Sequence, residues 1–199
     1  MAARVIGVHG AFHELWGPNQ FAARWLPALR DGLWLAGGPA LADDDFTVAF
    51  YGDLFRHDPA HDPAPHTVEE ALDQHHLSGL LDGASAQELV AGLQHALGDA
   101  LTVRLFDTIG HYVAEPDLRG AAAARLQARI NPAATVLVAH SLGSIVAYEA
   151  LCAHPEWPIR TFVTIGTPLG APSTRGAPSG EPMVTNVRIG HSGWAQSAS

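Results

Sequence analysis

Ser141 is the residue whose surroundings in the sequence best suit nucleophilic chemistry. It lies in the run from Val136 to Ala147, VLVAHSLGSIVA, where an apolar segment typical of a buried strand meets a segment with helical spacing. A serine hydroxyl is a weak nucleophile unless a base and an oxyanion site lie beside it. A sharp strand-to-helix turn exposes such a hydroxyl and demands small residues two positions before and after it, which Ala139 and Gly143 supply. We interpret Ser141 as a nucleophile, and an ordinary buried strand followed by a helix is the alternative.

A second apolar segment, Ala3 to Val8, ends in His9-Gly10-Ala11. A loop at the end of such a strand can offer a backbone N–H group to a developing oxyanion, and the residue after the nucleophile can offer another. We therefore expect the oxyanion donors to be the N–H groups of Ala11 and Leu142.

A third segment, Thr161 to Ile165, is typical of a buried strand and stops at Gly166-Thr167-Pro168. The three segments in this order resemble the α/β-hydrolase family, specifically its lipase and esterase branch, with its V-x-V-H-G, A-H-S-x-G and G-T-P patterns. The resemblance covers about residues 3–170. It implies ester hydrolysis through an acyl-enzyme on Ser141, with a small-molecule ester or acyl substrate and with no metal or organic cofactor.

The resemblance also implies a catalytic triad in the chain order serine, acid, histidine. After Ser141 there is no aspartate, and the remaining acids and histidines are Glu149, Glu156, Glu181, His154 and His191. Glu149 and His154 belong to the helix after Ser141 or follow it, and that helix leads away from the site. We therefore expect His191 to be the base, because a strand from Met183 to Ile189 would put it at a strand end.

The triad acid is left open by the sequence. Glu181 is one candidate, and Asp53, which follows Gly52 at the end of an expected strand, is another, although a role in a turn suits Asp53 better. His9 and His140 are interpreted as scaffolding imidazoles rather than as the base.

Strand and helix patterns alternate along the chain as a parallel sheet requires, so we expect an α/β fold with a mostly parallel sheet flanked by helices. The elements expected outside the three motifs are a helix over Asn19–Leu35 interrupted at Pro27, a strand over Phe46–Tyr51, a helix over Asp117–Ile130 and a strand over Ala134–Ala139. The hydrolase core is expected to span residues 1–170, with an irregular tail over 171–199. Because related proteins continue with two further strands, we expect the C-terminal part of the fold to be incomplete.

Residues 54–112 are expected to form a helical insertion, since leucine and valine recur there at helical spacing. Such an insertion lies where lipases carry a lid, and simple packing over the core is an equally good interpretation. Within it, the segment from His57 to His66 could bind a metal, but its prolines favour a surface loop, so no metal ligand is assigned. His75, His76 and His95 are interpreted as solvated helix-face residues.

Composition excludes several other classes of function. The formal net charge of −9 disfavours nucleic acid and anionic membranes as partners. The absence of lysine excludes Schiff-base chemistry and a P-loop lysine, and the single cysteine, Cys152, excludes an intrachain disulfide. We see no targeting signal and no apolar run of about 20 residues, so a cytoplasmic location is expected.

Two further functions stay open. The chain could be a catalytically impaired hydrolase-fold protein with a binding role, since the triad acid is not found. It could also be an amidase, a peptidase or an acyltransferase that uses the same serine, because the pocket selects the leaving group and the acceptor.

Overall fold

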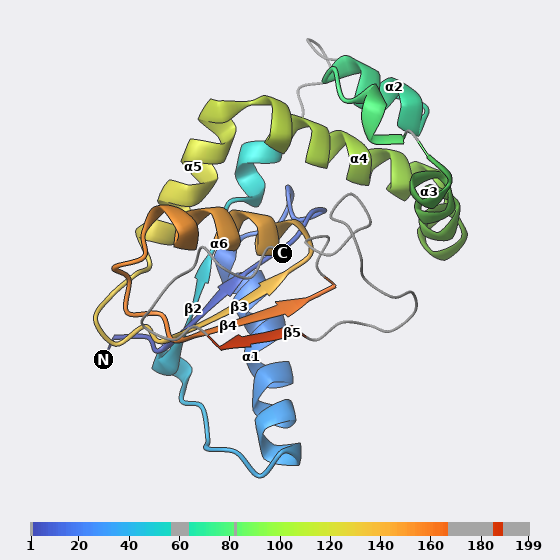
Figure 1. Cartoon of the computed structure of the whole chain (residues 1–199). Helices are drawn as coiled ribbons and strands as arrows, with labels where there is room; N and C mark the ends of the chain where they lie inside the picture. The colour runs from blue at the N-terminus through green and yellow to red at the C-terminus, as the bar shows by residue number, and fades with distance from the viewer. Residues whose placement is uncertain (1, 57–63, 82, 167–184, 189–199) are drawn as a thin grey trace.

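A five-stranded sheet forms the centre of the computed structural model, which describes residues 2–56, 64–81, 83–166 and 185–188 (Figure 1). The strands are β1 (Val5–Val8), β2 (Phe46–Ala49), β3 (Val136–His140), β4 (Thr161–Ile165) and β5 (Thr185–Arg188), in the order β2-β1-β3-β4-β5. The first four are parallel to one another, and β5 pairs antiparallel with β4. The α/β fold with a mostly parallel sheet is thus confirmed.

The register of the parallel strands brings three strand ends together. Val8, the last residue of β1, lies opposite Ala49 of β2 on one side and Ala139 of β3 on the other. The chain segments that follow these three strands therefore leave the sheet at the same edge. This edge is where ligands bind in open parallel sheets.

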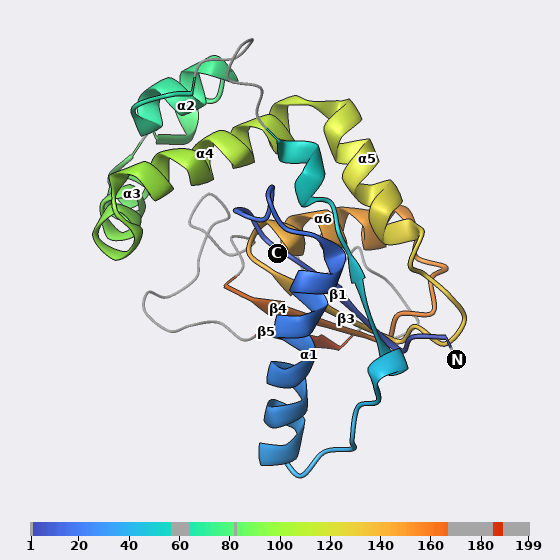
Figure 2. The ribbon, with the colours of Figure 1, turned by 180° about the vertical axis from the view of Figure 1, so that it is seen from behind.

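Helices cover both faces of the sheet (Figure 2). One face packs on α1 (Pro18–Leu35), and the other packs on α5 (Pro116–Gln127) and α6 (Leu142–Ala153). The alternation of strand side chains explains the two layers, because Phe46 and Val48 of β2 join Phe21 of α1 whereas Ala49 joins the core under α6.

The helix α1 differs from the expected one because it runs through Pro27 without interruption. Proline removes one backbone hydrogen bond and disturbs the preceding turn. Pro27 and Ala23, whose carbonyl group loses its partner, are both exposed residues. The helix begins with Pro18 in its first turn, a position that proline favours.

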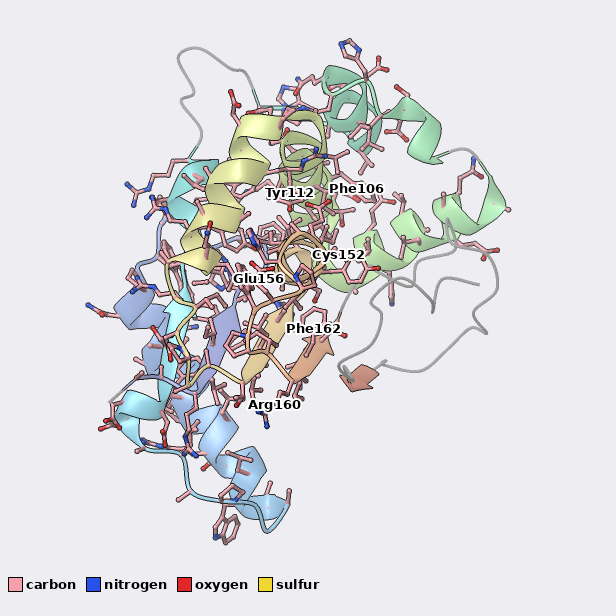
Figure 3. The ribbon with its side chains drawn as sticks, turned by 60° about the vertical axis from the view of Figure 1, so that its left-hand side comes forward. Phe106, Tyr112, Cys152, Glu156, Arg160 and Phe162 are labelled. Carbon is pink, nitrogen blue, oxygen red and sulfur yellow. The ribbon has the colours of Figure 1, made fainter. Side chains whose placement is uncertain are left out.

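Between β2 and α5 the chain forms α2 (Val68–Gln74), α3 (Ala84–Leu97) and α4 (Asp99–Ala114), with 3-10 turns at Gly52–Phe55 and Ser78–Leu81. These helices have a small apolar cluster of their own, made of Val68, Ala71, Leu72 and Val103. Phe106 and Tyr112 both come from α4 (Figure 3); Phe106 packs on this small cluster and Tyr112 is part of the main core. The helix α4 therefore joins the insertion to the sheet.

The strand expected over Met183–Ile189 is present as β5. Its direction matters, because Thr185 pairs with Thr164 and Arg188 pairs with Thr161. The strand therefore runs away from the edge at which β3 ends. The expected division into residues 1–170 and 171–199 stays a prediction, because 167–184 and 189–199 lie outside the described residues.

None of the helices in the described ranges is long and apolar enough to cross a membrane.

Replacement of Leu137 by alanine tests the central position of β3. Leu137 is 0% exposed and lies opposite Ile6 of β1 and Phe162 of β4. The cavity left by Leu137→Ala should lower the free energy of unfolding by about 2–5 kcal/mol, measured by urea denaturation. Leu89→Ala on α3, where the side chain is 44% exposed, should cost far less. Equal losses in the two variants would contradict this packing.

Candidate active site

Ser141 lies in a tight turn between β3 and α6. Its backbone has φ 51° and ψ −126°, a conformation that costs a non-glycine residue about 1–3 kcal/mol and is found most often at functional sites. The Ser141 N–H group donates to the Ile165 carbonyl at 3.0 Å, and the Ser141 carbonyl accepts from the Ser144 N–H group at 2.9 Å. These two bonds hold the turn from both sides, and they agree with the strand-to-helix turn expected from the sequence.

Glycine is required at position 143 because the first turn of α6 lies directly against the end of β1. A methyl group added at Gly143 would lie 2.2 Å from the His9 carbonyl oxygen and 2.6 Å from the Val8 carbonyl oxygen. Both are backbone atoms, one at the end of β1 and one directly after it, and they cannot move aside as a flexible side chain could. Ala139, two residues before Ser141, is fully buried. Position 143 thus accepts only glycine, and the buried position 139 is filled by the small side chain of alanine.

The loop after β1 lies beside the serine. A methyl group added at Gly10 would lie 2.8 Å from Cβ of Ser141, so glycine permits this close approach too. Within the described part of the chain, neither the Ala11 nor the Leu142 N–H group donates a hydrogen bond. The Leu142 N–H group also belongs to the first turn of α6, where the helix dipole favours negative charge. The two N–H groups expected as oxyanion donors thus have no hydrogen-bond acceptor among the described residues, and their role stays a prediction.

His9 is a buried structural residue. Its Nε2 atom accepts hydrogen bonds from the N–H groups of Tyr51 at 3.0 Å and Gly52 at 3.1 Å. Because Nε2 accepts, the ring proton resides on Nδ1, which donates to the Gly10 carbonyl at 2.7 Å. The Tyr51 hydroxyl donates to the His9 carbonyl, and the Tyr51 ring stacks on the imidazole. Both ring nitrogens are occupied, so the interpretation of His9 as scaffolding agrees with its contacts.

Burial is also the main reason why the pKa of His9 falls from 6.5 to about 3. The imidazole is therefore neutral at physiological pH. The ring connects the segments that follow β1 and β2 without bringing a positive charge to the loop after β1.

His13 is a site residue that sequence reasoning missed. Its Nδ1 atom lies 2.7 Å from the Ala11 carbonyl, and its ring packs edge-on against Trp16 and Phe21. The neighbouring Phe12 has φ 69°, another uncommon backbone conformation for a non-glycine residue. The short spacing of aromatic and histidine residues after β1 was the available signal. The contact with His13 involves the carbonyl group of Ala11 and not its N–H group.

The insertion reaches the loop after β1 through α4. Arg104 lies 3.4 Å from the Glu14 carboxylate, and its guanidinium group lies 5.5 Å from the centre of the Phe12 ring. Thr108 of α4 and Leu142 line a narrow crevice together with the loop. The insertion thus lies next to the candidate site, as either a lid or a packing role would require.

The other sequence candidates for the triad acid and base have partners elsewhere. Asp53 accepts from Arg125 of α5 at 2.9 Å, Glu149 accepts from Tyr112 at 2.6 Å, and His154 pairs with Glu156 at 3.0 Å. In the parts of the chain that the structure covers, no histidine–carboxylate pair adjoins Ser141. His191 and Glu181 lie outside the described residues, and their expected roles stay predictions. Because β5 is antiparallel, it gives no support for His191 at the Ser141 edge.

His140 stands directly before Ser141, and part of its surface faces solvent while the rest is covered. Partial burial and the nearby His13 lower its pKa below 6.5. Its expected scaffolding role stays a prediction.

Comparison with known proteins adds no family assignment. No family model, no curated protein and no solved structure matches this chain.

The pKa of His9 predicts a pH dependence of stability. Between pH 6.5 and about 3, the unfolded chain binds a proton on His9 and the folded chain does not, so protonation favours unfolding. The contribution is complete above pH 6.5 and is lost as the pH falls. Urea denaturation between pH 7.5 and 5 should show that wild type loses about 1.4 kcal/mol per pH unit more than His9→Gln below pH 6.5.

His13→Gln serves as the matched control for this experiment, because it removes a neighbouring histidine whose ring is only partly buried. It should keep the wild-type slope. If His9→Gln also keeps that slope, His9 is not a buried neutral imidazole.

Proposed function

We propose that this protein is a serine hydrolase that cleaves carboxylic ester bonds through an acyl-enzyme. The observation that carries the proposal is the turn at Ser141, which has φ 51° and lies beside the Gly10 loop with the Ala11 and Leu142 N–H groups unused by the described residues. Strain of this kind persists only where the surrounding structure enforces it. A nucleophile next to paired N–H donors is the arrangement that acyl transfer requires.

In the proposed reaction, Oγ of Ser141 attacks the ester carbonyl carbon and its proton passes to a base. The carbonyl oxygen becomes an oxyanion, which accepts hydrogen bonds from the Ala11 and Leu142 N–H groups. Collapse of this intermediate breaks the bond to the alcohol, which leaves with the proton from the base. Water then attacks the acyl-serine, and the second collapse releases the carboxylic acid and restores Ser141.

His191 is proposed as the base on the strength of its place in the chain alone. The substrate class is proposed to be a small-molecule ester or acyl compound, with no cofactor and no nucleic acid partner. A cytoplasmic location is part of the same proposal, and a chain with one cysteine is compatible with a reducing compartment.

Ser141→Ala should abolish hydrolysis of p-nitrophenyl acetate and butyrate. Loss of a triad nucleophile leaves only about 10³- to 10⁴-fold catalysis over water. Ser144→Ala is the matched control, because Ser144 lies one helical turn away and its buried hydroxyl has no hydrogen-bond partner in the described residues. Ser144→Ala should retain activity. Full activity in Ser141→Ala would end the assignment of Ser141 as nucleophile.

Ala11→Pro tests the oxyanion loop, because only proline removes the backbone N–H group. It should lower kcat for p-nitrophenyl butyrate by about 10²-fold or more. Ala11→Ser keeps the N–H group and a similar size, so it should have a much smaller effect. Equal losses in both variants would show that packing at Ala11, and not a donor, is what matters.

A binding role without catalysis is the second candidate function. It is favoured by the lack of a histidine–carboxylate pair next to Ser141 among the described residues. In that case wild type and Ser141→Ala should be equally inactive toward every ester tested. An amidase, peptidase or acyltransferase activity would instead show as Ser141-dependent turnover of the corresponding substrate.

A further inference from the structure

Three potential metal ligands meet between the end of α2 and the middle of α4. They are His75, Asp107 and His111, and one ligand atom from each lies within 4.8 Å of the others. The side chains are 9%, 17% and 25% exposed, respectively. His75 was expected to be a solvated helix-face residue, and the structure shows that α4 covers it instead.

The backbone of α4 is shaped to receive His75. A methyl group added at Gly110 would lie 2.2 Å from Cδ2 of His75, so glycine at this position lets the ring lie against the helix. Asp107 and His111 are four residues apart on α4, which places them on one face. The ring of His75 thus reaches both of them, with its centre 4.3 Å from that of His111.

The distances between the ligand atoms suit a small metal ion. Oδ1 of Asp107 lies 3.3 Å from Nε2 of His75 and 3.7 Å from Nε2 of His111. Two ligands that each bind a tetrahedral zinc ion at about 2.0–2.1 Å are roughly 3.3–3.4 Å apart. Small side-chain adjustments would therefore place all three atoms around one ion.

Glu115, the residue directly after the end of α4, completes the pattern. Its Oε1 atom lies 2.5 Å from Nδ1 of His111, on the side of the ring away from Asp107. Metal-binding histidines commonly donate the proton of their second nitrogen to a carboxylate, which fixes the ring and leaves the other nitrogen free to coordinate. Glu115 can serve His111 in this way.

We propose that His75, Asp107 and His111 bind a divalent transition metal, with zinc as the best match, and that Glu115 orients His111. Two imidazoles and one carboxylate favour zinc and its neighbours over magnesium or calcium, which prefer oxygen ligands. Three protein ligands leave a fourth position for water. The ion would connect the end of α2 to α4, where the apolar cluster of the insertion is small. This proposal is independent of the proposed esterase activity.

Zinc binding to the chelator-treated full-length protein tests the proposal. Isothermal titration with ZnCl₂ should give one strong site per chain, and Co²⁺ should give the d–d absorption of a tetrahedral complex. His75→Gln and His111→Gln should each weaken the strong site by at least about 100-fold. Glu115→Gln should weaken it by about 10- to 100-fold and keep the Co²⁺ spectrum.

Gly110→Ala is the sharpest variant, because it keeps every ligand. The added methyl group should displace only the His75 ring, and alanine favours a helix more than glycine does, so the metal-free protein should remain folded. Zinc affinity should still fall at least tenfold. At the same zinc concentration, the rise in melting temperature should be smaller in this variant than in wild type.

Two controls separate this site from other histidines. The exposed pair His76→Gln and His95→Gln, made together, should leave the strong site unchanged. The same holds for His57→Gln combined with His61→Gln, from the proline-rich segment that the sequence also suggested. Absence of any stoichiometric site, or a site lost in these controls and retained in His75→Gln and His111→Gln, would overturn the proposal.

Discussion

The contact on which the candidate site depends is the approach of the first turn of α6 to the end of β1. There is no space for a side chain at Gly143, because an added Cβ atom would lie 2.2 Å from the His9 carbonyl oxygen. This contact fixes the start of α6 relative to the sheet, so the chain must turn sharply at Ser141 to join β3 to the helix. The uncommon backbone angles of Ser141 follow from that requirement. The same approach brings the Gly10 loop alongside the serine.

A second constraint acts on the loop after β1 through the buried ring of His9. The His9 ring accepts hydrogen bonds from the N–H groups of Tyr51 and Gly52, which follow β2, and donates one to the Gly10 carbonyl in the loop after β1. The segments after β1 and β2 are therefore held together. Because the ring is neutral and uses both nitrogens, it adds rigidity without adding a charge. Arg104 and Thr108 of α4 also lie against this loop. Asp107 and His111 lie on this same helix, and His75 packs against it from the end of α2, so the packing of the insertion and the position of the loop after β1 both depend on α4.

Local patterns in the sequence predicted most of the elements that build the site. The strand predicted over Thr161–Ile165 has the same bounds as β4. The predicted end of a strand before Ser141 and start of a helix after it are also present, because short-range steric constraints determine this turn. The direction of β5 could not be predicted, because the alternation of side chains is the same in parallel and antiparallel strands. The environment of His75 was missed because it depends on a contact with Asp107, 32 residues away. The four-residue spacing of Asp107, His111 and Glu115 was a signal that the sequence analysis did not use.

The proposed ester hydrolysis requires Ser141 to be an activated nucleophile, and covalent labelling tests this most directly. The full chain should be incubated with a fluorophosphonate and then mapped by peptide mass spectrometry. We expect one adduct per chain, on Ser141, with Ser144 unmodified and with labelling slowed by Ala11→Pro, because the same N–H groups would stabilise the phosphonyl oxygen. No adduct on Ser141, or equal labelling of Ser141 and other serines, would show that the turn holds an ordinary hydroxyl and would contradict the account.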